Sequence, residues 1–488
     1  MAEGKYFSDG MKEQRRLVYF TYLLAAAITS VLFLGNTKKG KSGKEKEEKG
    51  LQRRERAAAV CVFLSVILTI VTVFGTFGKY GYGAKWNYKP YESARNEFLG
   101  SNAQLYPLDD DIFARKDIKG NVANEALYIG HNGVREYLSM VNQNIYEFYR
   151  QYVITSGLNG TNYILGGLNS RSGMEDLLAV RYYDDVKKDR IIENINQLPI
   201  AFTFDQYNLQ DEAEKVSAIE KNADILNVVI LDQEIEGMER KEQSDENNKA
   251  WTEESYDIEY INIDYSDTTI KVNPDSKIVI TVESGKGGEC YFYAKEFRIM
   301  DLARNTIYFD EVSCEFRNNS LQNRLKEHPA MICLGEIEKG KTIFEVTFTD
   351  NAEYMIEDIH MYTIDLNEVE RQNAERRSGS LRNISIEKDC ITGNIEVEKK
   401  KILFFGIPHS TGWSAYVDGK ETEILNADYG FMAIGLEEGS HEIKLIYFTP
   451  GLKLGIVCTI FGLLLLVILY RIKKMHYNIT IEEKSNGQ

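Results

Sequence analysis

Three apolar segments constrain this chain more than any other feature. Residues 17–35 and 57–78 are each about 20 residues long, the length that a hydrocarbon layer of about 30 Å requires of a helix. A third apolar run, residues 454–470, lies between Lys453 and Arg471, whose long side chains can reach the membrane surface. The sequence therefore predicts three transmembrane helices that flank one large polar region.

The distribution of basic residues predicts the orientation of these helices. The loop between the first two segments holds nine Lys and Arg residues, and the tail after the third begins Arg471-Ile472-Lys473-Lys474. Short loops rich in Lys and Arg stay in the cytoplasm. We therefore expect the N-terminus outside, the C-terminus in the cytoplasm and residues 79–450 outside. The alternative, a basic loop that binds nucleic acid or anionic lipid, is less favoured.

The large polar region is strongly acidic. Residues 57–450 contain 40 basic and 65 acidic residues, a net charge of −25. A negative field of this size argues against nucleic acid as a partner. Solvation of the surface is the simplest explanation of the charge.

Neither cysteines nor acidic clusters predict a metal site. The cysteines outside the membrane segments lack zinc-ligand spacing, and one disulfide among them is possible with its pairing left open. They are Cys290, Cys314, Cys333 and Cys390. Asp109-Asp110-Asp111 lacks the alternating ligands and the glycine of a calcium loop, so a solvated turn is favoured there.

Residues 79–250 show a mixed α and β pattern. Apolar residues spaced three and four apart predict one amphipathic helix; they are Leu138, Val141, Ile145, Phe148 and Tyr152. Residues 174–181 indicate a short helix that runs into a strand, and residues 211–226 indicate a further helix. Residues 236–249 are charged and are expected to form a linker or a long loop.

From Trp251 the apolar period becomes two, as in strands. Tyr256, Ile258 and Tyr260 alternate, and the alternation then shifts by one residue at Ile261, which predicts a β-bulge. Further strands are expected at residues 277–282, 289–293, 306–310 and 342–349. A polar helix at residues 365–377 is expected to end at Ser378-Gly379.

These patterns predict a membrane-anchored protein of the α+β or all-β class, with a mixed α/β part and two β-sandwich-like domains. The expected segments are an outside N-terminus 1–16, a membrane helix 17–35, a basic loop 36–56, a membrane helix 57–78, a mixed region 79–250, a β-sandwich 251–365, a connecting helix 366–379, a small membrane-proximal β domain 380–450, a membrane helix 451–470 and a cytoplasmic tail 471–488.

The stretch from Gly412 to Lys420 predicts a hairpin in the small β domain. Asp418-Gly419 is the dipeptide of a type I′ turn, which needs positive φ at both positions. Gly439 precedes His441 at the start of a further strand, where His441 is expected to anchor a turn rather than to bind a ligand. Asp418, Gly419, Gly439 and His441 are therefore predicted as structural turn residues.

Two aromatic residues of this hairpin are candidates for contact with a glycan. Trp413 and Tyr416 could stack on a sugar ring, although core packing is the favoured reading of Trp413. No catalytic residue is predicted. His409, Ser410, Cys390 and Asp418 lie in the same domain, but no nucleophile-elbow signature accompanies them.

The C-terminal part of the chain resembles the bacterial membrane protein YfhO family. The resemblance rests on the segments 175–182, 198–202 and 216–227 and on a motif set near the last membrane segment. That set comprises Ile407-Pro408, Gly412-Trp413, Val417-Asp418-Gly419-Lys420, Phe431, Leu436, Gly439, His441-Glu442-Ile443, Tyr447 and Pro450-Gly451-Leu452.

The resemblance implies a role in the bacterial envelope. Such proteins look like glycosyltransferases of the GT-C class that add sugars from a polyprenyl-phosphate donor to lipoteichoic acid or related polymers. Their catalytic acid lies in an early outside loop, and Asp9 does not match that loop. The chain itself is expected to hold no cofactor, and its expected partners are membrane lipid, an envelope polysaccharide or teichoic acid, and a separately encoded multi-span membrane protein. The alternatives are a non-catalytic, membrane-anchored glycan-binding protein and an inactive remnant.

Overall fold

A computed structural model describes residues 113–118, 132–137, 142–155, 164–185, 190–241, 250–266, 268–300, 304–310, 312–317, 327–387 and 389–485. All of them belong to Ala103–Gln488, the second of the two units into which the chain divides. The predicted membrane helices 17–35 and 57–78, the basic loop between them, Asp9 and the triplet Asp109–Asp111 lie outside the described residues.

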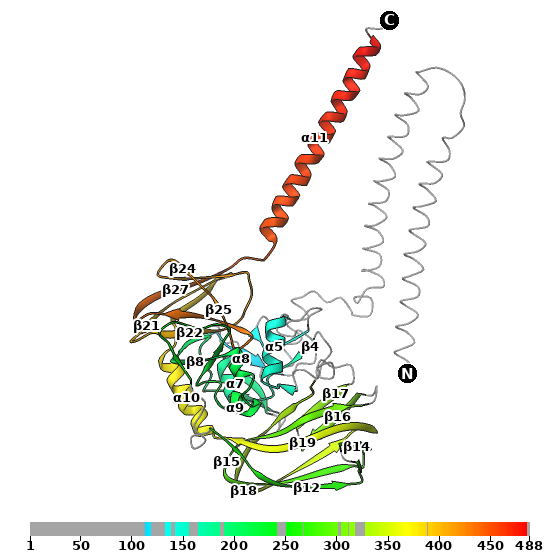
Figure 1. The fold of residues 1–488 in the computed structure, drawn as a ribbon, viewed down its shortest axis with the longest axis vertical. Coiled ribbons are helices and arrows are strands. Elements are labelled where there is room, and N and C mark those ends of the chain that lie inside the picture. Colours follow the sequence, from blue (N-terminus) through cyan, green and yellow to red (C-terminus); the bar gives the residue numbers. More distant parts are fainter. Residues whose placement is uncertain are drawn as a thin grey trace, which may run out of the picture. The chain divides into compact units, whose positions relative to one another are not determined.

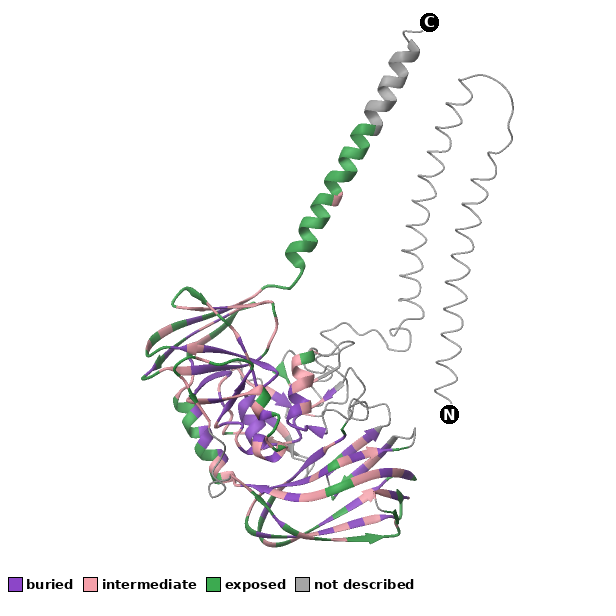
Figure 2. Cartoon of the chain, in the orientation of Figure 1, coloured by how far each residue is buried: buried purple, intermediate pink, exposed green. Residues whose placement is uncertain are grey.

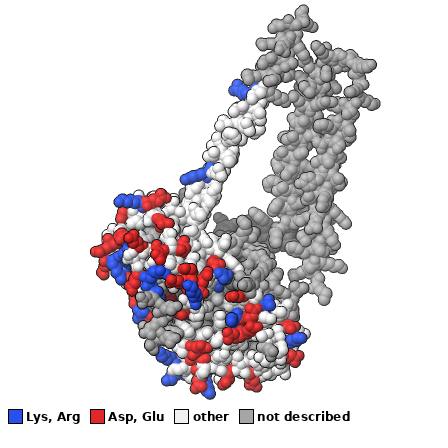
Figure 3. All heavy atoms as spheres, in the orientation of Figure 1, with Lys and Arg blue, Asp and Glu red and all other residues white. Residues whose placement is uncertain are grey.

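The predictions of a mostly β region and of an apolar C-terminal helix are confirmed. The helix α11, Leu452–Ser485, contains a candidate membrane span at Leu452–Ile472, with a mean hydropathy of 2.7 and none of its most apolar stretch buried. The surface of this span is exposed along nearly all of its length in Figure 2. The sequence has no charged residue between Lys453 and Arg471, and Figure 3 shows this part of the helix in white. An exposed apolar surface of this length suits a lipid environment.

Residues 251–364 form one nine-stranded sheet (Figure 1). Its strands run in the order β13-β14-β19-β15-β18-β16-β17, with β11 paired to β19 and β12 paired to β15. They are β11 Trp251–Glu253, β12 Ser255–Ile261, β13 Asp264–Ser266, β14 Thr269–Val272, β15 Lys277–Ile299, β16 Arg304–Phe309, β17 Val312–Arg317, β18 Ala330–Phe348 and β19 Ala352–Ile364.

The two strands predicted at residues 277–282 and 289–293 are in fact one long strand, β15. Its two halves contribute to the same apolar core, where Ile280 and Phe292 are both buried. The register with β18 shifts between Ser284 and Gly287, and Gly288 has a φ of 139° with room for no side chain, because a Cβ there would lie 2.4 Å from the Ile364 carbonyl oxygen. Glycine therefore lets the strand bend without ending.

The predicted β-bulge near Ile261 is wrong. The chain instead leaves one strand and begins another, because Asn262 has a φ of 53°. β12 pairs with β15, whereas β13 pairs with β14. The shift in alternation therefore marks a turn between two strands, at a residue type that tolerates the left-handed region.

A second, seven-stranded sheet joins distant parts of the chain, in the order β10-β8-β9-β25-β26-β22-β7, and a five-stranded sheet has the order β20-β21-β27-β23-β24. The first contains β7 Ala201–Phe204, β8 Gln206–Leu209, β9 Val229–Leu231, β10 Glu239–Arg240, β22 Lys401–Pro408, β25 Leu425–Ala427 and β26 Phe431–Leu436. The second contains β20 Arg382–Glu387, β21 Cys390–Val397, β23 Trp413–Val417, β24 Lys420–Thr422 and β27 Gly439–Tyr447.

Both faces of the seven-stranded sheet are buried. Along β22, Phe404 packs into the core shared with the helices, whereas Phe405 packs into the core shared with the five-stranded sheet. This explains why Lys401–Pro408 reads as a continuous apolar run rather than an alternation. Strands from both sides of the predicted domain boundary at residue 380 share this sheet. The boundary itself stays a prediction.

The remaining elements of the mixed region are short. They are β1 Arg115–Asp117, β2 Asn132–Gly133, β3 Arg135–Tyr137, α5 Gln143–Gln151, β4 Ile164–Gly166, α7 Ser172–Leu177, β5 Val180–Asp185, β6 Arg190–Glu193, α8 Gln210–Ala213 and α9 Ala218–Ala223. The predicted helix-to-strand element at 174–181 is confirmed by α7 and β5. The helix predicted around Phe148 is shorter than expected, and Leu138 and Val141 lie outside the described residues.

The single helix predicted at residues 211–226 is wrong, because two short helices occupy this stretch. Ser217 caps the second one, and its side-chain oxygen accepts a hydrogen bond from the Glu220 amide at 3.3 Å. Serine favours this position because its side chain satisfies a free amide of the first turn. The predicted linker 236–249 contains β10, and residues 242–249 lie outside the described part.

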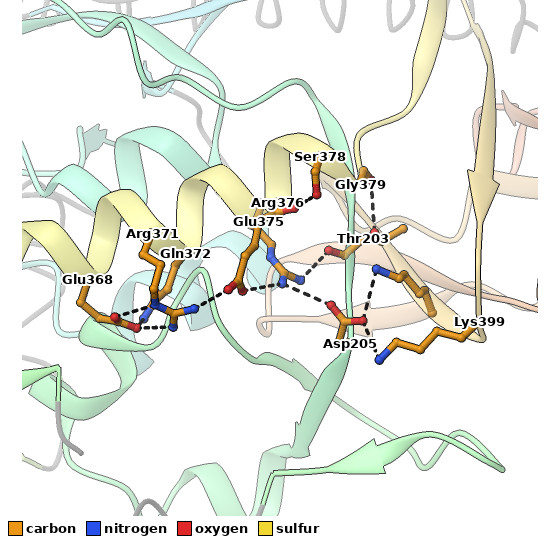
Figure 4. Close-up of polar contacts among 11 residues, drawn as sticks. Thr203, Asp205, Glu368, Arg371, Gln372, Glu375, Arg376, Ser378, Gly379 and Lys399 are labelled. Atoms are coloured by element: carbon orange, nitrogen blue, oxygen red, sulfur yellow. Dashed lines mark hydrogen bonds and ion pairs between the residues drawn. The ribbon is translucent and has the colours of Figure 1, made fainter. Parts of the chain in front are cut away.

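The polar connecting helix is confirmed as α10, Leu366–Ser378. The carboxylate of Asp365 accepts a hydrogen bond from the Asn367 amide, and Gly379 forms the C-cap. Figure 4 shows how its polar face is linked to β7. Arg376 donates to the Thr203 carbonyl at 2.6 Å and pairs with Asp205 at 3.4 Å.

Candidate functional site

A cavity of about 490 Å³ lies among β8, β9, β10, α8 and α9, and we call it the charged pocket. This volume falls within the range of about 300–1,000 Å³ that is typical of small-molecule sites. Its lining is Tyr152, Asn208, Glu212, Ala213, Lys215, Val216, Glu220, Lys221, Asp224, Val228, Ile230, Arg240 and Lys241. The set combines four cations, three carboxylates and an apolar part.

The strands fix the position of this lining. β8 pairs in parallel with β9 on one side and with β10 on the other. A parallel pair needs a crossover, and α8 and α9 supply it between β8 and β9. The lining residues of both helices thus lie beside the strand residues Asn208 and Ile230.

Two cations of the pocket are neutralised by carboxylates. Arg240 pairs with Glu212 at 2.7 Å and with Glu234 at 3.1 Å. Lys241 pairs with Asp224. These pairs hold β10 against the two helices.

Lys221 differs from these residues because it is only 9 % exposed. Its ammonium donates to the neutral Gln151 side-chain oxygen at 3.1 Å. Burial lowers the pKa of Lys221 to about 8, and the nearby Arg150 guanidinium lowers it further. The carboxylates of Glu214 and Glu147 lie near enough to raise this pKa in part. Of these, Glu147 is already bound through two oxygens to Arg150.

A buried acid lies next to the pocket. The hydroxyl of Tyr152, which lines the cavity, donates to the Asp428 carboxylate at 2.9 Å, and the Ile230 amide donates to the same oxygen at 3.1 Å. Asp428 is fully buried, and burial raises its pKa to about 7. The pocket therefore has a proton-holding group behind its wall.

A second candidate surface lies on the nine-stranded sheet, where aromatic rings and carboxylates from β11, β15 and β19 meet. Tyr362 lies 5.5 Å from Trp251, 6.1 Å from Tyr293 and 5.7 Å from His360 between ring centroids. The two His360 nitrogens contact Glu253 at 2.7 Å and Asp358 at 3.0 Å. We call these six residues, all half-buried or exposed, the aromatic–carboxylate patch.

The structure places the two predicted glycan contacts apart. Trp413 is half-buried, packs on the core shared with the seven-stranded sheet and lies 5.1 Å from the Tyr447 ring. Tyr416 lies on the opposite face of β23, beside Lys444 of β27 and Glu421 of β24. The two rings therefore do not form one stacking surface.

The four predicted turn residues lie close together in the five-stranded sheet. Asp418 and Gly419 have φ angles of 53° and 76° and connect β23 to β24. The Asp418 carboxylate contacts His441 Nδ1 at 2.8 Å and accepts from the Glu442 amide at 2.8 Å. Gly439 begins β27 with a φ of 145°.

Asp418 is thus engaged by His441 and not by His409. His409 contacts the Asn144 side chain at 3.2 Å, and Ser410 accepts from the Gly412 amide at 3.4 Å. Cys390 lies at the start of β21 opposite Ile446. No nucleophile and base are assembled by these four residues.

Buried ionisable groups around α7 form a third polar cluster, which the sequence patterns missed. Glu175 is fully buried, and burial, reinforced by the neighbouring Asp117, raises its pKa well above the usual value. Burial raises the pKa of Asp176 to about 7, although Asn194 and Asn373 donate to it. Arg171 donates to four oxygens, three of them backbone carbonyls.

The sequence contains one indication that Lys221 is buried. Lys221 follows Ala218 by three residues and precedes Ile225 by four, so it lies on the apolar face of its helix. A lysine on such a face is almost never buried without a partner. Asp428 gave no comparable signal.

The α10 network in Figure 4 is a structural clamp rather than a site. Asp205 accepts from Lys399 and Lys401 at 3.2 Å each, besides Arg376. Glu368 and Arg371 form an exposed pair one turn away on the same helix. Each carboxylate of this network is paired with a cation of the same chain.

The described part of the chain is a mostly β region followed by an exposed apolar helix that contains one candidate membrane span. The chain belongs to the bacterial membrane protein YfhO family, whose model matches residues 5–459. It is 22 % identical over 394 residues to the uncharacterized protein YfhO of Bacillus subtilis (strain 168), covering 76 % of this chain and 44 % of that protein. The chain thus spans less than half the length of this curated relative.

Solved structures give only distant likeness. The arabinofuranosyltransferase AftD from Mycobacteria, as its R1389S mutant, matches with a TM-score of 0.14 and 13 % identity, covering 36 % of this chain and 14 % of AftD. Vicilin from Corylus avellana (hazelnut) matches with a TM-score of 0.08 and 8 % identity, covering 41 % of this chain and 81 % of vicilin.

Proposed function

We propose that this chain takes part in the glycosylation of lipoteichoic acid or a related polymer of the bacterial envelope. The observation that carries the proposal is the charged pocket in a member of the YfhO family. A cavity of 490 Å³ with charged and apolar walls has the size and the polarity for a sugar unit of a donor or acceptor. The donor implied by the resemblance is a polyprenyl-phosphate sugar.

The proposal includes a topology and partners. Residues 79–450 lie outside the cytoplasm of the plasma membrane, and residues 17–35, 57–78 and 451–470 lie in lipid. A separately encoded multi-span membrane protein supplies catalysis, and the β-rich region receives or guides the acceptor polymer. No catalytic role is assigned to a residue of this chain.

Deletion of the gene tests the function. We expect the sugar content of lipoteichoic acid or another wall polymer to fall, as measured by NMR of the purified polymers. A plasmid copy should restore it, whereas a copy with Asn208→Asp, which adds a carboxylate to the pocket, should restore it only in part. An unchanged sugar content in every polymer fraction would refute the proposal.

The topology and the partner have tests of their own. A cysteine introduced at Ser42 should resist impermeant thiol reagents on intact cells, because that loop is expected in the cytoplasm. The multi-span protein should co-purify with the tagged chain in mild detergent. Failure of co-purification would remove the partner from the proposal.

A second candidate function is non-catalytic binding of an envelope glycan. The aromatic–carboxylate patch favours it, because half-exposed rings can pack on the apolar face of a sugar while carboxylates accept from its hydroxyls. In a pull-down with purified wall polysaccharide, Tyr293→Ala and Tyr362→Ala should each reduce retention of the full chain. If Tyr416→Ala reduces retention instead, the site lies on the hairpin that the sequence indicated.

A further inference from the structure

The charges of the pocket do not balance around Lys221. Arg240 and Lys241 are bound to carboxylates, as described above. Lys221 lies near the carboxylates of Glu214 and Glu147 but donates to neither of them, and Arg150 binds both oxygens of Glu147. The Gln151 side-chain nitrogen donates to a Glu147 oxygen at 2.9 Å, and the Gln151 side-chain oxygen accepts from the Lys221 ammonium. The neutral amide therefore lies between Lys221 and this carboxylate.

This imbalance is costly in a buried position. Lys221 is nine-tenths buried, and a buried cation is usually paired with an anion. Lys215, which lines the same cavity from the loop before α9, is exposed and adds a second positive charge. The lining thus has four cations and three carboxylates, and Lys221 is the buried cation among them.

The apolar part of the lining adds a second requirement. Val216, Val228 and Ile230 border the cavity together with the Tyr152 ring. A bare inorganic anion would leave this apolar surface without contact. A ligand that fills 490 Å³ needs a carbon framework beside its anionic group.

From these observations we propose that the charged pocket binds the phosphate ester of a small polyol, a sugar phosphate or a glycerol phosphate unit, with Lys221 as the counter-ion of the phosphate. The ester oxygens accept hydrogen bonds from the Lys221 ammonium, with Lys215 at the mouth of the pocket. The polyol carbons lie against Val216, Val228 and Ile230. This inference rests on the proposed function and names the ligand class of the same site.

Calorimetric titration of the purified full chain in detergent tests the proposal. The probes are glucose 1-phosphate, glycerol 1-phosphate, inorganic phosphate and glucose. We expect the two esters to bind at least about tenfold more tightly than inorganic phosphate or glucose, because only the esters meet both the cation and the apolar wall. The ester that binds more tightly identifies the source of the ligand.

Matched variants assign the effect to Lys221. Lys221→Met should weaken ester binding about tenfold or more, and Lys221→Arg should retain most of it. Asn208→Asp keeps the acceptor for the Leu209 amide, which donates at 2.8 Å, but adds a negative charge to the pocket, so it should also weaken ester binding. Lys444→Met, an exposed change on β27, should have no effect.

Equal binding of glucose and glucose 1-phosphate would overturn the proposal, and so would unchanged ester binding in both Lys221→Met and Asn208→Asp. Should Lys221→Met fail to fold, Asn208→Asp decides alone. Ester binding with a normal envelope sugar content in the deletion strain would keep this inference and refute the proposed function. An altered envelope sugar content without ester binding would refute this inference and keep the proposed function.

Discussion

The nine-stranded sheet and the region around α7, α9 and α10 are both well buried, but by different chemistry. The core between the halves of the sheet is built from aliphatic, aromatic and sulfur-containing side chains such as Phe292 and Phe297, and the ionisable residues Glu254, Glu289 and His328 are buried outside this cluster. The helical region instead buries Arg171, Glu175 and Asp428.

This difference indicates that the two regions respond differently to pH. Apolar packing stabilises in proportion to the area buried and does not depend on pH. A buried ionisable group costs free energy unless it is paired, and such groups gather at functional sites. The apolar core of the sheet therefore contributes stability that is independent of pH, whereas the helical region, which borders the charged pocket, holds buried groups whose protonation can affect stability.

The largest effect is expected in the apolar core. Phe297→Ala should lower the free energy of unfolding by about 3–5 kcal/mol, because it removes a large buried ring and leaves a cavity. Phe297 is 2 % exposed and lies 4.7 Å from the Phe316 ring. Urea denaturation followed by near-UV circular dichroism measures the change. Tyr308→Ala, at a ring that is 39 % exposed, is the control and should change stability by less than about 1 kcal/mol.

The next effect tests the polar region. Arg171→Met should cost about 3 kcal/mol, because the carbonyls of Tyr152, Val153 and Met331 lose a charged donor inside the protein. Arg171→Lys, which keeps the charge but not the planar fork, should fall between wild type and Met. If the Arg171→Met variant proved as stable as the wild type in the same denaturation experiment, the hydrogen bonds from the buried Arg171 would not stabilise this region.

The two regions should also differ in their response to pH. The pKa of Asp428 is raised by burial from 3.8 to about 7 in the folded state. The stabilisation from protonated Asp428 is therefore fully present below about pH 4 and is lost as the pH rises through about 7. It amounts to at most about 1.4 kcal/mol for each unit by which folding raises the pKa. Asp428→Asn should reduce the fall in melting temperature between pH 5 and pH 8.

Asp418→Asn provides the comparison for this pH experiment. The pKa of Asp418 is lowered by its hydrogen bond from His441, so its contribution is present at neutral pH and is lost on acidification. Equal pH profiles for wild type and Asp428→Asn would show that Asp428 does not titrate in this range.

The smallest effect is expected outside both regions, at the hairpin of the five-stranded sheet. Gly419→Ala should cost about 1 kcal/mol, because Gly419 has a φ of 76° and a side chain there is strained even in open space. Gly285→Ala is a matched control, since a Cβ at Gly285 also meets nothing within 4 Å and no positive φ occurs there. A similar loss in melting temperature for both variants would contradict the explanation from backbone strain.

Local features of the sequence predicted local structure well. The polar run from residue 365 and the stop at Ser378-Gly379 predicted α10 to within a residue at each end. The apolar run after Lys453 predicted the C-terminal helix, and the segment 174–181 predicted the passage from α7 to β5. Each of these depends on interactions between residues a few positions apart.

Predictions that needed distant partners were less successful. The alternation at Ile261 was interpreted as a bulge, because the sequence does not reveal that β12 pairs with β15 while β13 pairs with β14. The charged pocket was not predicted at all, since its lining comes from five separate elements and from Tyr152.

The sequence by itself determined that an apolar helix long enough to span a membrane follows a mostly β region and that the chain resembles the YfhO family. Hydrophobic length, period-two alternation and turn dipeptides are properties of short segments. Only the tertiary structure decided that Phe202 pairs with Phe404 across 202 residues and that the buried Lys221 ammonium donates to the neutral Gln151 side chain. Burial and charge balance depend on which segments meet, and that is fixed only when the whole core packs.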